Sequence, residues 1–332
     1  MRIIGTLMVR DEVDIVAAMV EHHLAQGLDK LIVTDNRSFD GTTEVLEAYA
    51  ETGLIELHHD PEHRKQQRDV VTRMARRART HYRADWVLNL DADEFLIPVD
   101  KRLTVRQALE ATPLHLNAFT VPVFNLIGPA GWAGSGIGRL CWRDLRTDAQ
   151  LRAIGIHAQP TPNAVHRGES DIVVQQGNHV TSMPSNGQPP PEVSMEVLHL
   201  PWRSWTQFER KVVNAGRGYE ASPDLKPSRN HHGMADYRRY KEGTLEQSYI
   251  ARSPLPDDLR VGEANGWYVR DPWLHEHMEE LMGSALRPDL LRAVLDTEHL
   301  VDPPPELADT PLRRHLDLDR RARIVDTDSA TA

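Results

Sequence analysis

The segment WVLNLDADEFLIP, residues 86–98, carries both the strongest fold signal and the strongest chemical signal of this sequence. Residues 86–90 form a short, mostly apolar run, which is typical of a strand buried in a parallel sheet. Three carboxylates, Asp91, Asp93 and Glu94, follow directly after it. Ligand sites in open α/β sheets lie at the carboxyl ends of strands. The segment therefore predicts a buried strand that ends at a polar site.

The three carboxylates indicate which ligand that site binds. Neighbouring carboxylates repel one another and raise each other's pKa, and a bound cation keeps them ionised. Their hard oxygen atoms favour Mg²⁺ or Mn²⁺ over Zn²⁺. An ion held by one or two carboxylates completes its shell with water and substrate phosphates. The segment thus predicts a metal–diphosphate site at the end of the strand.

Two other interpretations of the acidic motif stay open. In the first interpretation, the acidic motif is only a solvated turn after a strand, because short acidic motifs are common. In the second, the protein is a phosphatase that attacks through an aspartate, which also places D-x-D after an apolar strand. That design has Thr or Val two residues after the second Asp and uses the first strand. Here Phe95 stands at that position and three strand-like runs come earlier.

Composition restricts the class of protein. The chain has 332 residues, 27% charged and 40% hydrophobic, which is ordinary for a globular protein of one large domain or two. Its net charge of -10 argues against general nucleic-acid binding, which needs a basic surface. The single cysteine, Cys141, cannot form an internal disulfide, so a reducing, cytoplasmic location is expected. No run of about 18 apolar residues is present, and no membrane span is expected.

The earlier part of the chain predicts a parallel sheet. Apolar runs at residues 3–9, 30–34 and 54–58 alternate with helical patterns, and the first two runs form a βαβ unit. The loop DNRSFDGT, residues 35–42, follows the second run. Its side chains either cap the next helix or, at Asp35 and Asn36, contact the base or ribose of a nucleotide.

Residues 63–83 predict a basic amphipathic helix. Most of its arginines form a solvated face, while those near its start are candidates for phosphate contacts. A peripheral contact with a membrane surface is an alternative role for this face. The glycine-rich stretch 128–138 lacks the P-loop spacing and predicts a mobile loop, with Trp132 able to stack on a sugar, or a plain surface loop.

Two histidines are candidates for completing a metal site. His199 ends an apolar run, and His179 follows Gly177 and Asn178. A histidine at a strand end is commonly structural, but a D-x-D site needs one more protein ligand, and imidazole supplies one. His199 is the first choice and His179 the second.

Several motifs in order resemble the family-2-like glycosyltransferases of GT-A fold. The branch with D-N-x-S-x-D-G-T and W-x-x-x-x-D-x-D-E-F-L motifs matches residues 35–42 and 86–96. Val9 to Glu12, V-R-D-E, resembles the R-N-E turn of the family, with Asp11 in place of Asn. Residues 177–179 and 199–211 resemble its later G-N-H and H-Y-x-x-x-S-x-x-x-F-x-x-K segments, with Leu200 in place of Tyr. The resemblance covers about residues 1–220.

This resemblance implies a GT-A type α/β fold, with a Rossmann-like, mixed and mostly parallel sheet flanked by helices. Helical patterns at residues 234–250 and 274–300, beyond the resemblance, predict a helical C-terminal appendix. Residues 1–225 would form the transferase domain, 226–306 a helical extension and 307–332 a polar, flexible tail. It also implies a nucleotide-sugar donor, a divalent cation (Mn²⁺ or Mg²⁺), and an unknown glycan, lipid-linked or small-molecule acceptor. The implied nucleotide-sugar residues are Arg10, Asp35, Asn36, Gln67, Asp91 and Lys211, and the implied metal ligands are Asp91, Asp93, His199 and His179.

The expected reaction is a metal-dependent, inverting glycosyl transfer to an acceptor hydroxyl. Such a reaction needs positive charge on the leaving diphosphate and a carboxylate that deprotonates the acceptor. Glu94, Asp171 and Glu196 are the candidates for that base. Two alternatives remain: a nucleotidyltransferase, which normally has a glycine-rich basic loop after its first strand, and an inert nucleotide- or carbohydrate-binding protein of the same fold.

Overall fold

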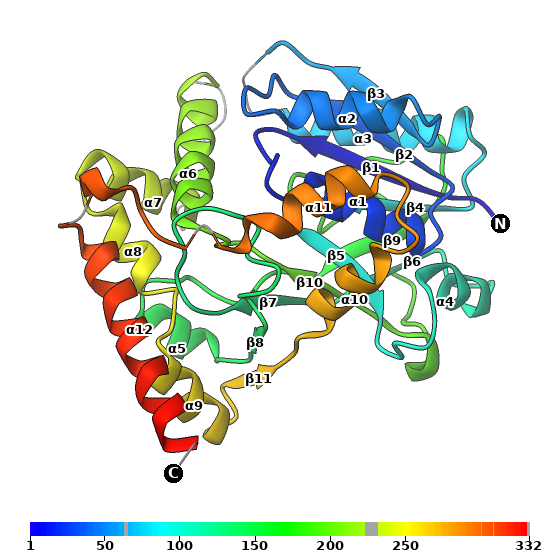
Figure 1. Cartoon of the computed structure of the whole chain (residues 1–332). Coiled ribbons are helices and arrows are strands. Elements are labelled where there is room, and N and C mark those ends of the chain that lie inside the picture. Colours follow the sequence, from blue (N-terminus) through cyan, green and yellow to red (C-terminus); the bar gives the residue numbers. More distant parts are fainter. Residues whose placement is uncertain (63–65, 223–231, 300, 308, 331–332) are drawn as a thin grey trace. The chain divides into compact units, whose positions relative to one another are not determined.

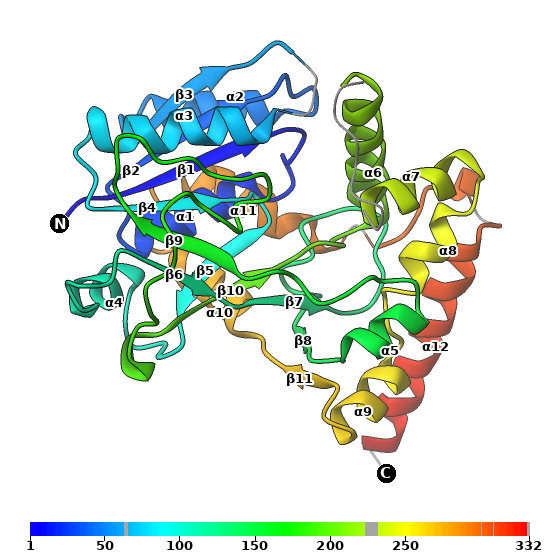
Figure 2. The ribbon, with the colours of Figure 1, turned by 180° about the vertical axis from the view of Figure 1, so that it is seen from behind.

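The computed structural model describes residues 1–62, 66–222, 232–299, 301–307 and 309–330, which form two compact units. The first unit contains Met1–Val123, Pro160–His199 and Glu280–Leu291. The second contains Phe124–Gln159, Leu200–Glu279 and Arg292–Ala332. The chain is drawn in sequence colours in Figure 1 and from behind in Figure 2. The expected domain boundary at 225/226 lies outside the described residues and stays a prediction.

A six-stranded sheet forms the centre of the first unit, with the strand order β3-β2-β1-β4-β9-β6. The strands are β1 (Ile3–Val9), β2 (Lys30–Asp35), β3 (Ile55–His59), β4 (Trp86–Leu90), β9 (Asn163–Arg167) and β6 (Ala118–Val121). β1 to β4 are parallel, whereas β9 runs antiparallel to both β4 and β6. The expectation of a mixed, mostly parallel sheet is therefore confirmed. Pro122 follows β6, the edge strand, as its missing N–H requires.

Helices cover this sheet, as Figures 1 and 2 show. They are α1 (Val16–Ala25), α2 (Thr42–Ala50) and α3 (Gln67–Thr80), while α4 (Val105–Ala111) lies beside residues 94–98. α3 is the expected basic helix; residues 63–65 of the predicted range lie outside the described residues. Its apolar stripe, including Val70, Val71 and Met74, packs on Ile4 and Val87 of the sheet.

A second strand pair begins where β4 ends. β5 (Glu94–Pro98) pairs antiparallel with β10 (Met195–His199), so that His199 lies opposite Glu94. A short 3₁₀ turn at Pro191–Val193 precedes β10. The chain thus leaves the parallel sheet through Asp91, Ala92 and Asp93 and enters a new pair at once.

The second unit is built mainly from helices. Its strands are β7 (Val123–Ile127), β8 (Trp142–Asp144) and β11 (Tyr268–Arg270), with β8 antiparallel to both others. Its helices are α5 (Asp148–Ala153), α6 (Trp205–Glu220), α7 (His232–Lys241), α8 (Leu245–Ile250), α9 (Pro256–Ala264) and α12 (Pro311–Ala330), with 3₁₀ turns at Asp296–His299 and Pro305–Leu307. Two further helices, α10 (Trp273–Leu281) and α11 (Pro288–Leu295), carry the chain into and out of the first unit.

Two segments of the second unit differ from expectation. Residues 311–330, expected to be a flexible tail, form α12, because Leu312 and Leu316 lie one helical turn apart and bury against Tyr249 and Leu245. The glycine-rich stretch is packed rather than mobile. The Gly131 carbonyl accepts from the Tyr249 hydroxyl at 3.0 Å, and a Cβ at Gly134 would lie 2.5 Å from the Thr297 carbonyl oxygen. The glycines allow close packing here.

Among the described residues, no helix has the length and apolar character needed to cross a bilayer.

Glu21 joins three elements of the first unit. Its side chain is buried in α1, and Oε1 accepts from the Tyr49 hydroxyl at 2.8 Å and from the Arg287 backbone N–H at 2.7 Å. Oε2 accepts from the Leu286 N–H at 2.9 Å. This carboxylate therefore satisfies two backbone donors just before α11 as well as a buried hydroxyl.

We predict that Glu21→Gln lowers the free energy of unfolding by about 1–3 kcal/mol, because the new NH₂ group faces a donor and leaves it unsatisfied. Urea unfolding measures this, with Glu47→Gln, on the exposed face of α2, as a control expected within about 0.5 kcal/mol of wild type. Equal stability of the two variants would contradict the prediction.

His23 makes the first unit sensitive to acid. It is fully buried; Nδ1–H donates to the Met19 carbonyl at 2.9 Å, and Nε2 accepts from the Leu96 N–H at 3.4 Å. Burial lowers the pKa of His23 from 6.5 to about 4, with the Met19 carbonyl opposing the shift. Between these two pH values the unfolded chain binds more protons than the folded chain.

We predict that the stability contribution of neutral His23 is complete above pH 6.5 and is lost as the pH falls towards 4, by about 1.4 kcal/mol per pH unit. The variant His23→Asn, which can still donate to the Met19 carbonyl, is less stable at pH 7.5 but has a flatter pH dependence. Urea midpoints at pH 7.5, 6 and 5 test this, and parallel pH dependences would contradict it.

Candidate functional site

The turn from β4 to β5 places two aspartates at the carboxyl edge of the sheet. The Asp93 side chain is buried, and its Oδ2 lies 3.5 Å from Nε2 of His199 at the end of β10. The β5–β10 register fixes this approach, because it pairs His199 with Glu94, the residue after Asp93. The structure thus brings together the predicted metal ligands Asp93 and His199.

Asp91 is held by neutral amides. Its Oδ1 accepts from Asn178 Nδ2 at 3.1 Å and from Gln67 Nε2 at 3.4 Å. Gln67 Oε1 in turn accepts from the Gly177 N–H at 3.3 Å. The start of α3 and the 177–179 turn therefore both meet the end of β4, and Gln67, an expected pocket residue, lies in the site.

The 177–179 turn has a backbone that its sequence explains. Gly177 has φ +84° and Asn178 has φ +63°, which is the left-handed region that Gly and Asn adopt most readily. A Cβ at Gly177 would lie 3.0 Å from both Cδ2 and Nε2 of His179. Glycine is therefore needed so that the His179 ring can pack against the turn.

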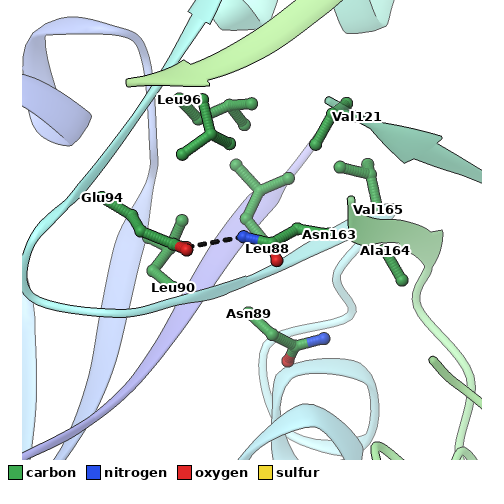
Figure 3. A pocket seen from close by; sticks show the side chains of 10 residues that line it. Leu88, Asn89, Leu90, Glu94, Leu96, Val121, Asn163, Ala164 and Val165 are labelled. Atoms are coloured by element: carbon green, nitrogen blue, oxygen red, sulfur yellow. Dashed lines mark hydrogen bonds between the residues drawn. The ribbon is translucent and has the colours of Figure 1, made fainter. Parts of the chain in front are cut away.

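Glu94 and His179 are joined through Asn163 of β9. Asn163 Nδ2 donates to Glu94 Oε2 at 2.6 Å, as Figure 3 shows, and Asn163 Oδ1 lies 2.9 Å from His179 Nδ1. A cavity of about 10 Å³, room for about one water molecule, lies beside Glu94 and Asn163. Apolar side chains such as Leu96 and Val121 form most of its wall, so the Glu94 carboxylate lies in a largely apolar setting.

Burial also acts on the His179 ring. It lowers the pKa of His179, the charge of His199 lowers it further, and the Pro162 carbonyl opposes both. The His179 ring therefore favours the neutral form.

Many polar side chains of the 35–42 loop form hydrogen bonds within the protein. Asp35 Oδ1 accepts from the Ser38 hydroxyl at 2.6 Å, and Oδ2 accepts from the Thr43 hydroxyl at 2.7 Å. Asn36 Nδ2 donates to the Glu62 carbonyl at 2.7 Å. Both side chains are buried, so Asp35 and Asn36 shape the loop whether or not a nucleotide contacts them.

Arg10 links the ends of β1 and β2. Its Nη1 donates to the Asn36 carbonyl at 2.6 Å, and its guanidinium lies 5.5 Å from the ring centre of Phe39. Arg37 lies 5.4 Å from the same ring, which is 70% exposed. Burial lowers the pKa of Arg10, against the raising effect of Asp11. An exposed aromatic ring between two cations was not anticipated from the sequence.

Two expected residues, Asp171 and Glu196, are not brought to this site. Asp171 is exposed, and its carbonyl accepts from Arg76. Arg76 lies nine residues along α3 from Gln67, which is a helix rise of about 14 Å between these two residues. Glu196 lies opposite Ile97 and pairs with Lys101 at 2.8 Å, near the far end of β5. Lys211 lies in α6 of the second unit, and its expected role stays a prediction.

The donor set suits a hard divalent cation that is completed by substrate. No three His, Cys, Asp or Glu side chains within the described ranges form a metal-holding group by themselves. Asp93 and His199 supply one carboxylate and one imidazole at 3.5 Å. Mg²⁺ is commonly bound through one or two carboxylates together with substrate phosphates. The pair therefore fits Mg²⁺ or Mn²⁺.

Residues 4–118 match a known family, glycosyltransferase family 92. The match includes Arg10, the 35–42 loop and the Asp91–Glu94 segment. The enzyme class expected from the sequence, a glycosyltransferase of EC 2.4 type, is confirmed, and so is a mixed α/β fold of GT-A type with a helical C-terminal region. The matching family is family 92, however, and not the family-2-like branch to which the motifs were compared.

More distant similarities concern solved structures, and no curated protein matches the chain significantly. S. aureus TarS 1–349 in complex with UDP-GlcNAc is 13% identical, with a TM-score of 0.38 over 90% of this chain and 92% of that one. Glucosyl-3-phosphoglycerate synthase from Mycobacterium tuberculosis, in complex with Mn²⁺, UDP and phosphoglyceric acid, is 17% identical, with a TM-score of 0.28 over 50% of this chain and 55% of that one. Similarities this remote carry no argument about substrate.

We predict that Asp35→Asn lowers the free energy of unfolding by about 1–3 kcal/mol, because the carboxylate accepts from the Ser38 and Thr43 hydroxyls inside the loop. Urea unfolding tests this, with Asp69→Asn on the exposed side of α3 as the control. Unchanged stability together with a large loss of nucleotide affinity would instead assign Asp35 to the ligand.

Proposed function

We propose that the protein transfers a sugar from a nucleotide-sugar donor to an acceptor hydroxyl, with a divalent cation and with inversion at the anomeric carbon. The observation that carries this proposal is the Asp93–His199 pair at the carboxyl edge of the sheet, on a turn that lies within the family match. Asp93 and His199 would hold the cation, and Asp91 would lie beside it. The cation supplies positive charge that stabilises the leaving diphosphate.

The chain's own residues prepare the site before any ligand binds. Asn178 and Gln67 fix the direction of the Asp91 carboxylate, so that little ordering is left to be done upon binding. On the β1–β2 side, Arg10 and the exposed ring of Phe39 offer a cation and an aromatic face, which suit a nucleotide. The proposed donor site therefore extends from the end of β4 to the end of β2.

A thermal-shift screen tests this function. UDP-, GDP-, dTDP- and CMP-sugars are each added with Mn²⁺ and with EDTA. A ligand at about 100 times its Kd stabilises the fold by about 2.7 kcal/mol, which such a screen detects. We expect a metal-dependent shift for one nucleotide class, followed by release of the nucleoside diphosphate from that donor. Binding without turnover would favour an inert protein of the same fold, and no shift with any donor would count against the proposal.

Asp93→Ala should abolish the metal-dependent shift, because it removes the carboxylate of the Asp93–His199 pair. Asp93→Asn keeps the shape of the side chain and should lose the shift as well, which separates loss of charge from loss of packing. Asp69→Ala is the matched surface control. Full activity of Asp93→Ala with unchanged Mn²⁺ dependence would contradict the site assignment.

A further inference from the structure

The turn that carries Asn178 is the tip of a short hairpin, residues 171–182. Val174 faces Thr181 across this hairpin as an isolated antiparallel bridge. The neighbouring residues make the cross-strand backbone bonds, 2.8 Å each, from the Gln175 N–H to the Val180 carbonyl and from the Ser182 N–H to the Val173 carbonyl. Bonded and non-bonded pairs alternate along an antiparallel ladder, so the N–H and carbonyl of Val174 point away from Thr181, towards the outer edge of the hairpin.

At this outer edge, α3 lies where a neighbouring strand would lie. The Thr72 hydroxyl oxygen accepts from the Val174 N–H at 3.0 Å, and the hydroxyl donates to the Val174 carbonyl at 3.2 Å. One turn further along α3, Arg76 donates from Nε to the Ile172 carbonyl at 2.7 Å and from Nη2 to the Asp171 carbonyl at 3.1 Å. Two side chains of α3 therefore satisfy four backbone groups of the hairpin.

The same strand of the hairpin is buried against α3. Ile172 is 1% exposed and Val174 is 0% exposed, and both belong to the core cluster that contains Val70 and Met74 of α3. Water therefore competes little for the backbone groups of Val174, and leaving them unsatisfied would be costly. Most arginines of this helix were expected to form a solvated face, whereas Arg76 is half-buried and donates to the hairpin.

The tip of the hairpin contacts the candidate site. Asn178 Nδ2 donates to Asp91 Oδ1 at 3.1 Å, and the Gly177 N–H donates to Gln67 Oε1 at 3.3 Å. The Asn178 carbonyl accepts from the Ala164 N–H of β9 at 3.1 Å. Asn178 is 1% exposed, so its side chain has little freedom to move independently of its backbone. The orientation of the Asp91 carboxylate therefore depends on where α3 holds the hairpin.

We propose that Thr72 and Arg76 are positioning residues for the donor site. They hold the 171–182 hairpin on α3, so that Asn178 keeps the Asp91 carboxylate in its orientation, and they act through the hairpin rather than by contact with the donor. This inference rests on the proposed function. Groups that orient the ligands of a metal commonly change metal affinity or activity about 10–100-fold when they are removed. Loosening the hairpin should therefore weaken the binding of donor and cation while the protein stays folded.

The first test, amide hydrogen exchange, needs no ligand. Thr72→Val removes the hydroxyl and keeps the shape of the side chain, so amides of the hairpin should exchange at least about tenfold faster, while those of β1 and β4 stay near wild type. Thr72→Ser keeps a hydroxyl for both bonds and should exchange as wild type does. Thr80→Val is the control, because Thr80 is exposed and its hydroxyl donates within α3. Unchanged exchange of the hairpin in Thr72→Val would overturn the proposal.

The second test measures the Kd of a donor that passes the binding screen, with Mn²⁺ and well below the Tm of each variant. A variant that is only less stable is still folded under these conditions and binds as wild type does. Thr72→Val and Arg76→Met should instead raise the Kd about tenfold or more, while Thr72→Ser stays near wild type. Arg73→Met, at an exposed arginine of α3, is the control for Arg76→Met. An unchanged Kd in either variant would exclude that residue from the positioning role.

The two proposals fail in different ways. If wild type binds no donor, the proposed function fails and the role in donor binding fails with it, whatever the exchange of the hairpin. If the donor binds and the hairpin loosens in Thr72→Val and Arg76→Met without a change in Kd, the function stands and the positioning role fails. Thermal unfolding of each variant separates both outcomes from a failure to fold. Should Thr72→Val not fold, Arg76→Met serves for both tests with the same expectations.

Discussion

The direct passage of the chain from β4 into β5 is the constraint on which the site depends. Three residues, 91–93, carry the chain out of a parallel sheet and into an antiparallel pair with β10. There is no room for a loop, so Asp91 and Asp93 stay at the strand ends, where both are fixed by their neighbours. The same passage places Glu94 opposite His199. The strand pairing therefore brings the His199 imidazole to the Asp93 carboxylate.

Local sequence patterns were sufficient for the parallel part of the fold. The apolar runs at 3–9, 30–34, 54–58 and 86–90 became β1 to β4, because strands buried on both faces leave a continuous apolar signature. Pairings between distant segments leave no such signature. The insertion of β9 between β4 and β6, and the pairing of β5 with β10, were therefore not predicted. α12 was missed because two buried leucines among many charged residues give a weak pattern.

The candidate site was predicted in part, for a related reason. Asp91, Asp93 and His199 were found because motif and strand end coincide in sequence. Asn163 was missed, because an asparagine at the start of β9 looks like ordinary turn chemistry until its two partners, 69 and 16 residues away, are seen. Asn178 belongs to the Gly177–Asn178–His179 motif noted in the sequence. The structure shows that it holds a turn, with a left-handed backbone next to Gly177.

Amides recur around the site, and their chemistry explains why. Gln67 and Asn178 both donate to Oδ1 of Asp91 and, being neutral, add no charge of their own. An amide also has one donor end and one acceptor end, and Asn163 uses both: Nδ2 donates to Glu94, and Oδ1 faces Nδ1 of His179. Amides thus fix the direction of the groups they contact without adding charge of their own.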